Sequence, residues 1–299
     1  MLLLTMENNT AKWWYLVILA IVWGSSFILI KKSLIALTPI QLGAFRVFIS
    51  GVFLIIIGFK HLKVIRKHHW KWLITAGFLG TFFPAFCFAY AQTEIDSAVT
   101  SILNATTPIM TLIFGLLFFK VGFSARQIIG VLIGLTGCFL LIWQGAEINA
   151  HQDYRYVLFI FIATWGYAMN VNILKSRLED LPSVTISTAS FLAITFPAFI
   201  ILLFSGFFTK LNFSDSTTLY SIGAATILAI FSSALALLLF NKLIKMTTAV
   251  FSASVTYLIP VIALVWGIFD GEKFMLSQIA AACIILFGVI LSNTHKRKV

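Results

Sequence analysis

The chain alternates between long apolar runs and short polar segments. The apolar runs occupy about residues 13–30, 40–59, 72–91, 97–119, 127–144, 156–174, 184–207, 218–240, 248–269 and 277–293. A helix of about 20 residues crosses the hydrocarbon core of a bilayer. Within that core, helices satisfy their own backbone polar groups. The pattern therefore predicts ten transmembrane helices joined by short loops.

Composition supports a membrane protein over a soluble one. Of 299 residues, 60% are hydrophobic and only 10% are charged, whereas soluble domains have about 25% charged residues. The first apolar run is longer than the apolar core of a signal peptide, and no A-x-A cleavage site precedes Lys31 and Lys32. We therefore expect a retained first span in an all-α integral membrane protein.

The basic residues predict an orientation. The net charge of +11 does not indicate nucleic-acid binding, because the basic residues lie between apolar runs. If the N-terminus is cytoplasmic, the inside segments hold fifteen Lys and Arg residues and the outside segments hold five. This bias follows the positive-inside rule, so we expect both termini in the cytoplasm.

The two halves of the chain are similar to each other. "TTPIMTLIFGLLFF" (106–119) matches "LIPVIALVWGIFDGE" (258–272), and "RQIIGVLIGLTGCFLLIW" (126–143) matches "SQIAAACIILFGVILSN" (277–293). A Trp-Gly pair occurs at 23–24 and again at 165–166. These matches predict two five-helix units, residues 1–148 and 149–299. Because five is odd, the second unit is inverted relative to the first, as in many secondary transporters.

Several of these features together resemble the EamA family of the drug/metabolite transporter superfamily. Besides the ten spans, they are "WGSSF" at Trp23 to Phe27, Arg46, Pro108, Pro260, and Gly271-Glu272 closing the ninth span. The resemblance covers nearly the whole chain. It implies a multi-pass carrier in the bacterial inner membrane for small polar metabolites, often an exporter of amino acids or related compounds.

One position departs from the family pattern. Family members often have a Glu at the end of the fourth span, where this chain has "FFKVG" with Lys120. A mechanism that needs matching carboxylates in the two repeats is therefore not expected here.

A substrate site is expected near the midplane, at broken helices. Pro108 and Pro260 occupy corresponding places in the two halves and each removes a backbone hydrogen bond, so we expect helix breaks there. Arg46 is the only charged residue well inside an expected span, and such a charge faces the protein interior or water. It can anchor a substrate carboxylate, form a gate, make a structural bond to carbonyls or a carboxylate, or extend to the outer surface.

Polar and aromatic residues in the same spans complete the expected substrate site. They are Trp23, Ser26, Tyr90, Asn104, Thr107, Trp165, Tyr167, Asn170 and Tyr257. We expect Gly24 and Gly166 to let neighbouring helices approach closely, and Trp23 and Trp165 to lie near the axis shared by the repeats.

No Asp, Glu or His lies deep in an expected span. Proton-coupled carriers use such residues, so we expect facilitative or exchange transport, or coupling through an outer carboxylate such as Glu94. His68 and His69 have no carboxylate beside them in the sequence, and the three cysteines, in apolar runs, lack metal-site spacing. No Walker-type loop is present.

These observations favour a secondary transporter of small polar metabolites that works by alternating access between the two repeats, and they leave alternatives. We expect no metal, no cofactor, no enzymatic activity and no nucleic-acid partner; the expected partners are a small-molecule metabolite and the lipid bilayer. A facilitative channel and a non-transporting membrane protein remain as alternatives. The substrate, the direction of transport and the oligomeric state stay open.

Overall fold

The computed structural model describes residues 2–119, 124–148, 152–247, 252, 254–272 and 276–293. Within these ranges every regular element is a helix and there is no strand. Lys120 and part of the expected ninth span, residues 248–251 and 253, lie outside the described residues. In the first half the elements are α1 (Leu2–Ser33), α2 (Pro39–Gly58), η1 (Phe59–Val64), η2 (Lys67–His69), α3 (Trp70–Gly77), η3 (Phe78–Phe82), α4 (Phe83–Ala91), α5 (Ser97–Asn104), α6 (Thr107–Phe119) and α7 (Ala125–Ile148).

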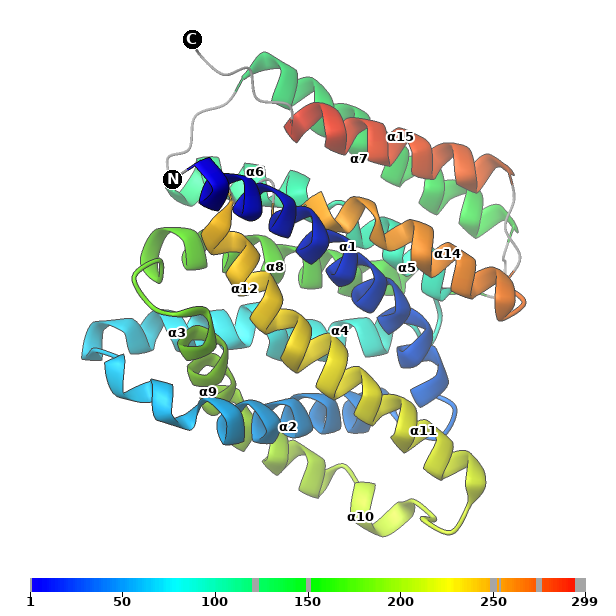
Figure 1. The fold of residues 1–299 in the computed structure, drawn as a ribbon. Helices are drawn as coiled ribbons and strands as arrows, with labels where there is room; N and C mark the ends of the chain where they lie inside the picture. The colour runs from blue at the N-terminus through cyan, green and yellow to red at the C-terminus, as the bar shows by residue number, and fades with distance from the viewer. Residues whose placement is uncertain are drawn as a thin grey trace.

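The second half has a similar order of elements. They are η4 (Tyr154–Tyr156), α8 (Val157–Arg177), α9 (Ser183–Phe204), α10 (Phe207–Lys210), α11 (Ser216–Ile227), η5 (Leu228–Leu235), α12 (Ala236–Met246), η6 (Ser254–Tyr257), α14 (Ile259–Phe269) and α15 (Leu276–Asn293). Consecutive elements often form one continuous rod, as α11, η5 and α12 do in Figure 1.

Seven helical segments of the described chain are long and apolar enough to cross a membrane. They are Ala11–Ser33, Pro39–Val64, Lys67–Ala91, Ser97–Phe119, Tyr154–Arg177, Ser183–Lys210 and Ser216–Met246. Three shorter apolar helices, Ile128–Gly137, Val255–Phe269 and Ile279–Gly288, overlap the other three expected spans. The all-helical membrane class is therefore confirmed.

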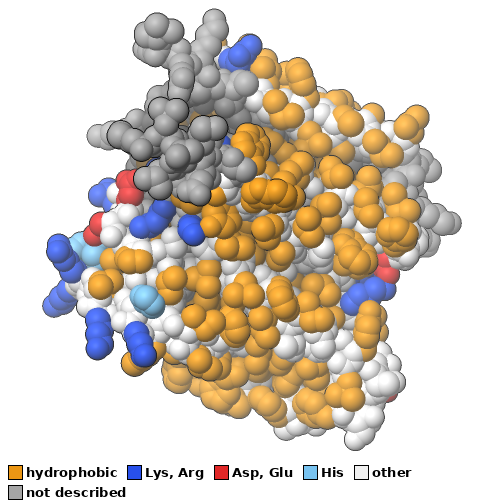
Figure 2. All heavy atoms as spheres, viewed as in Figure 1, with side chains coloured by type: hydrophobic (Ala, Val, Ile, Leu, Met, Phe, Trp, Pro, Cys, Tyr) orange, Lys and Arg blue, Asp and Glu red, His pale blue; other side chains and the backbone are white. Residues whose placement is uncertain are grey.

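The surface separates apolar and basic regions. Figure 2 shows apolar side chains over most of the visible face, and Lys and Arg side chains gathered at the end that holds η1 and the start of α3. At this end, Lys71 and Arg177 lie over the ring of Trp72, 5.0 and 5.2 Å from its centroid. An indole ring with cations beside it is typical of a membrane–water interface.

Glycines allow the closest helix contacts. A Cβ atom on Gly24 would lie 2.5 Å from Cβ of Ile262, and one on Gly166 would lie 2.4 Å from the carbonyl oxygen of Leu79. The expected close approach at both Trp-Gly pairs is therefore confirmed. The last helices of the two halves, α7 and α15, lie side by side in Figure 1, with Gly288 against the backbone of Gly134.

Four helical rods are irregular, and they occur in two corresponding pairs. A two-residue turn separates α5 from α6, so that Pro108 is the second residue of α6. Pro260 is the second residue of α14, which follows η6 after one turn residue. The segments η3 and η5 are π-helical stretches inside the rods α3–α4 and α11–α12. Pro84, the second residue of α4 after η3, removes one backbone donor from that rod.

An ion network ties the end of α1 to α14 and α5. Lys31 Nζ lies 2.8 Å from both Asp270 Oδ2 and Glu272 Oε1, and Lys32 also pairs with Asp270. Glu272 Oε1 accepts hydrogen bonds from the backbone N–H and hydroxyl of Ser97, at 3.2 and 2.7 Å. The Glu272 side chain is only 2% exposed, so it caps α5 while balancing Lys31. We call these contacts the Lys31 network.

Replacing Gly166 by Ala tests the contact between α8 and η3. The added methyl group meets a backbone oxygen that cannot rotate away, so we expect a loss of about 1–3 kcal/mol and a lower unfolding temperature in detergent. Gly223→Ala is the matched control, because a Cβ there has no neighbour within 4 Å; it should be neutral or stabilising by up to about 1 kcal/mol. Equal unfolding temperatures for the two variants would contradict this packing.

Glu272→Gln tests the Lys31 network. The amide keeps the size of the carboxylate but loses the charge that balances Lys31. Breaking a fully buried pair costs about 3–5 kcal/mol; because Lys31 is 34% exposed, we expect about 1–3 kcal/mol here, measured by thermal unfolding. Glu94→Gln is the control, since Glu94 has no ion pair with any described residue. A Glu272→Gln protein as stable as this control would show that the network is solvated.

Candidate functional site

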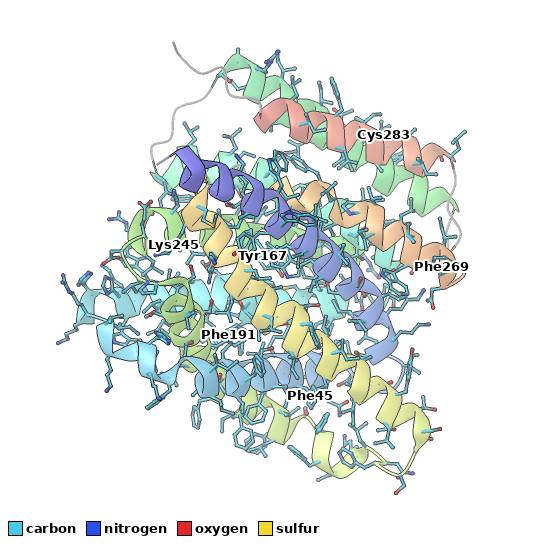
Figure 3. The ribbon with its side chains drawn as sticks, in the orientation of Figure 1. Phe45, Tyr167, Phe191, Lys245, Phe269 and Cys283 are labelled. Atoms are coloured by element: carbon cyan, nitrogen blue, oxygen red, sulfur yellow. The ribbon has the colours of Figure 1, made fainter. Side chains whose placement is uncertain are left out.

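A cavity of about 100 Å³ lies between the first and second halves of the chain. Figure 3 shows Tyr167, one of its lining residues, near the middle of the helix assembly. The first half lines it with Trp23, Ser26, Phe27, Ile30, Arg46, Gly80, Thr81, Phe88, Asn104 and Thr107. The second half lines it with Tyr167, Asn170, Val171, Ser232, Ser233, Leu237, Phe240, Val255, Thr256 and Ile259. The cavity therefore has an aromatic and aliphatic wall with separate polar groups.

All four irregular rods reach this cavity. The rod of α5 and α6 contributes Asn104 and Thr107, one on each side of its turn, and the rod of η6 and α14 contributes Thr256. The π-helical stretches contribute Thr81 from η3, and Ser232 and Ser233 from η5. Irregular backbone at membrane depth occurs where it lines a cavity, and π-helical turns occur frequently at functional sites.

Among the described residues that line the cavity, Arg46 is the only Lys, Arg, Asp or Glu. Its Nε donates a 2.6 Å hydrogen bond to Ser233 Oγ, which joins α2 to η5 in the other half. The residue is 9% exposed. Its terminal guanidinium nitrogens have no hydrogen bond or ion pair to any described residue. Arg46 thus presents a buried positive charge that this part of the chain does not neutralise.

Asn170 presents an amide that also lacks a partner. The residue is 6% exposed and lines the cavity. Its Oδ1 is fully buried and accepts no hydrogen bond from the described residues. A buried, unsatisfied polar group costs about 1–3 kcal/mol. Since Oδ1 is not accessible in this conformation, it gains a partner only when the Asn170 side chain turns toward the cavity.

Trp23 fixes one wall of the cavity. Its Nε1 donates to the carbonyl oxygen of Ser232 at 2.9 Å, and its ring lies 4.9 Å from that of Phe240 at 65°. In return, Ser232 Oγ donates to the carbonyl oxygen of Val22 at 3.3 Å. The π-helical stretch η5 thus exchanges hydrogen bonds with α1, which holds both rods against the cavity.

The structure brings seven of the ten predicted substrate-binding residues together around this cavity. They are Trp23, Ser26, Arg46, Asn104, Thr107, Tyr167 and Asn170. Within this group, Thr107 Oγ1 donates to the carbonyl oxygen of Asn104 at 2.7 Å, and the ring of Tyr167 stacks on Phe88 at 5.9 Å.

The other three residues lie elsewhere. Tyr90 stacks on Phe159 at 5.4 Å, and Tyr257 belongs to η6 but not to the lining. Trp165 is 48% exposed on the outer surface, with its ring edge toward Phe114 at 6.2 Å. Trp165 therefore lies outside the lining of this cavity. Gly166, one residue later, faces η3, and successive side chains on a helix point about 100° apart, so Trp165 faces outward.

Other lining residues were missed at the sequence level. Gly80 and Thr81 reach the cavity because η3 is π-helical, and no sequence periodicity predicts a π-helical stretch. Pro84 is the one local signal, since it removes a backbone donor from this rod. Phe88 and Phe240 have no sequence signal that separates them from the many other phenylalanines in the spans.

The histidine pair has a carboxylate near it after all. His69 Nε2 lies 2.9 Å from Asp180 Oδ2, and His68, His69 and Asp180 offer ligand atoms within 4.8 Å of one another. His69 Nδ1, however, accepts a 3.1 Å hydrogen bond from the backbone N–H of Arg66. Both ring nitrogens of His69 therefore have protein partners, and the contact connects the segment before α3 to the segment after α8.

Comparisons with known proteins agree with this architecture. The profile of the EamA-like transporter family matches residues 12–143 and again 154–294. The uncharacterized transporter YvbV of Bacillus subtilis is 24% identical over 94% of this chain and 91% of its own length. The uncharacterized inner membrane transporter YedA of Escherichia coli is 23% identical over 93% of this chain and 89% of its own length.

A solved crystal structure of a protein shows the same fold. It superposes with a TM-score of 0.64 at 18% sequence identity and covers 94% of this chain and 96% of its own chain. The family profile matches both halves and most of the sequence, and the curated relatives align over nearly their full length. This chain therefore belongs to the EamA-like transporter family.

Proposed function

We propose that this protein is a secondary transporter that moves small polar metabolites, such as amino acids or related compounds, out of the cell. The observation that carries the proposal is the cavity around Tyr167, lined by both halves, where Arg46 is buried and has no acidic partner among the described residues. Substrate and ion sites of secondary transporters lie at the interface of their repeats, at discontinuous helices. Family membership and the names of the relatives as transporters support the same class.

The proposed mechanism is alternating access between two inverted five-helix repeats with ten spans in total. Two matches to the family profile, one in each half, support a repeat. So do the π-helical stretches in the corresponding rods α3–α4 and α11–α12, and the breaks before Pro108 and Pro260. In this proposal the protein lies in the inner membrane with both termini in the cytoplasm.

Each polar group of the cavity has a proposed role. Arg46 binds an acidic group of the substrate, because guanidinium and carboxylate pair through two parallel hydrogen bonds. Asn170 and Asn104 bind its other polar groups, and Trp23 and Tyr167 contact its apolar part. Ser233 orients the guanidinium through the 2.6 Å hydrogen bond to Nε.

The Lys31 network is the proposed outer gate. It joins α1 and α14 to the start of α5, and these rods also line the cavity. Opening this end requires that Lys31 and Lys32 separate from Asp270 and Glu272. Water then solvates the separated groups, including Glu272, whose side chain is 2% exposed in this structure.

A transport assay tests the proposed function. Purified protein in liposomes should show saturable counterflow of at least one labelled L-amino acid or small organic acid from a panel. We expect Asn170→Ala to lower the rate about two- to tenfold, the effect of losing one hydrogen bond. Asn212→Ala, at an exposed loop position, should transport normally. Single-channel currents without saturation would instead identify a pore.

The pH dependence of the network follows from Asp270. Partial burial on its own would raise the pKa of Asp270, but hydrogen bonds from Lys31 and Lys32 outweigh it and lower the pKa below the usual 3.8. The contribution of Asp270 to stability is therefore complete above pH 3.8 and disappears as the pH falls through the lowered pKa.

The matching experiment compares wild type with Asp270→Asn. The difference in thermal stability should be at most about 1 kcal/mol, as for partly exposed pairs. It should stay constant from about pH 8 to 5, because Asp270 remains ionised throughout, and shrink below pH 3.8. A difference that changes between about pH 8 and 5 would assign the pH dependence to another group.

A further inference from the structure

We infer that Arg46 makes this transporter an exchanger of small organic anions. The cavity closes readily around an anion and slowly when empty, so that one anion leaves as another enters. This inference rests on the proposed transport function and adds its mode and the charge of its substrate.

The positive charge of Arg46 is not balanced by an acidic residue in the cavity lining. Every acidic residue with a described side chain lies outside the cavity lining. The acids that form ion pairs in the described chain have other partners: Asp270 and Glu272 pair with lysines at the end of α1, Asp180 with His69, Asp153 with Arg155, and Glu179 with Lys175. No carboxylate of the described chain is therefore available to neutralise Arg46.

The guanidinium of Arg46 uses only one of its nitrogens for a protein contact. Ser233 Oγ accepts a hydrogen bond from Nε. The hydroxyl is neutral, so it orients the guanidinium without balancing its charge. The remaining donors have no hydrogen bond to the described residues, and they match the two oxygens of a carboxylate or sulfonate. The site is thus preorganised for an anion and is incomplete without one.

Closing the cavity changes the solvation of the Arg46 guanidinium. In an open state, water solvates the guanidinium; closing removes bulk water and leaves the charge in apolar surroundings. An uncompensated buried charge is strongly unfavourable, whereas a paired and hydrogen-bonded one is tolerated. The empty carrier therefore crosses the closed state much less often than the loaded carrier. Net transport requires the empty crossing, but exchange does not.

The same lining disfavours other solutes. A cation would meet the positive charge of Arg46 with no carboxylate to compensate, and a neutral solute would leave Arg46 unpaired. The aromatic side chains Trp23, Phe88 and Phe240 suit an apolar body. Benzenesulfonate has this combination: it stays ionised, has an aromatic body and does not cross lipid unaided. Benzenesulfonamide is its neutral counterpart of similar shape.

The experiment uses the full-length protein in liposomes in a gluconate medium. Labelled benzenesulfonate is added to vesicles preloaded with benzenesulfonate, with benzenesulfonamide, or with medium alone. We expect uptake into the benzenesulfonate-loaded vesicles to exceed uptake into the other two by at least about tenfold, equivalent to about 1.4 kcal/mol in the crossing step. In parallel, benzenesulfonate but not benzenesulfonamide should raise the unfolding temperature of the protein in detergent.

Three variants assign the effect to Arg46. Arg46→Gln should abolish the thermal shift and bring the ratio of exchange to net uptake close to one. Arg46→Lys keeps the charge and should retain a ratio well above one with weaker binding, because Lys lacks the planar fork. Arg155→Gln makes the same substitution at a 90% exposed arginine and should behave as wild type.

The outcomes separate this inference from the proposed function. Equal uptake into loaded and empty vesicles would overturn the exchange mode, while the proposed transport function would stand. The absence of a thermal shift with benzenesulfonate, or a shift that survives Arg46→Gln, would overturn the anion site. A thermal shift that depends on Arg46, without transport of benzenesulfonate or of any solute in the panel, would retain the anion site and reject the transport function.

Discussion

The buried positive charge of Arg46 is the constraint on which the middle of this structure depends. In the hydrocarbon region a guanidinium needs polar surroundings, and regular apolar helices present none. The structure supplies them with segments in which the helical pattern changes. Ser233 in the π-helical stretch η5 takes one donor, and the turns before Pro108 and Pro260 add Asn104 and Thr256 to the same cavity. The buried charge and the four interrupted rods therefore meet at the same cavity.

Close packing elsewhere makes this irregular centre possible. The carbonyl oxygen of Leu79, within η3, touches Gly166, where a Cβ atom would leave only 2.4 Å. The carbonyl oxygen of Ser232, within η5, instead accepts a hydrogen bond from Trp23. Each Trp-Gly pair thus contacts one π-helical stretch, but through a different residue. Gly166 leaves space for the backbone of η3, whereas Trp23 donates a hydrogen bond to the backbone of η5.

The sequence predicts most of this fold and part of the site, for identifiable reasons. Apolar runs and lysine placement predict the helices, because membrane thickness sets helix length. Arg46 and Asn170 are predicted as site residues because polar groups inside a bilayer are rare and need partners. Trp165 was misplaced because a motif match gives the position of a residue along a helix but not the direction in which it points. Thr81 was missed because π-helical geometry depends on tertiary contacts that no local pattern records.

The cavity and the Lys31 network have three rods in common. From Ser26 to Lys31 along α1, and from Ser97 to Asn104 along α5, the separation is five to seven residues, or about 8–10 Å of helix. The rod that contains η6 and α14 also has a lining residue, Ile259, near its start and ends next to Asp270. In the proposed mechanism, a solute that binds both Arg46 and Asn104 shifts α2 and α5, and α5 includes Ser97, which donates a hydrogen bond to Glu272. The same proposal thus links the charge of the solute, through the rod of α5 and α6, to the ion pairs at the end of α1.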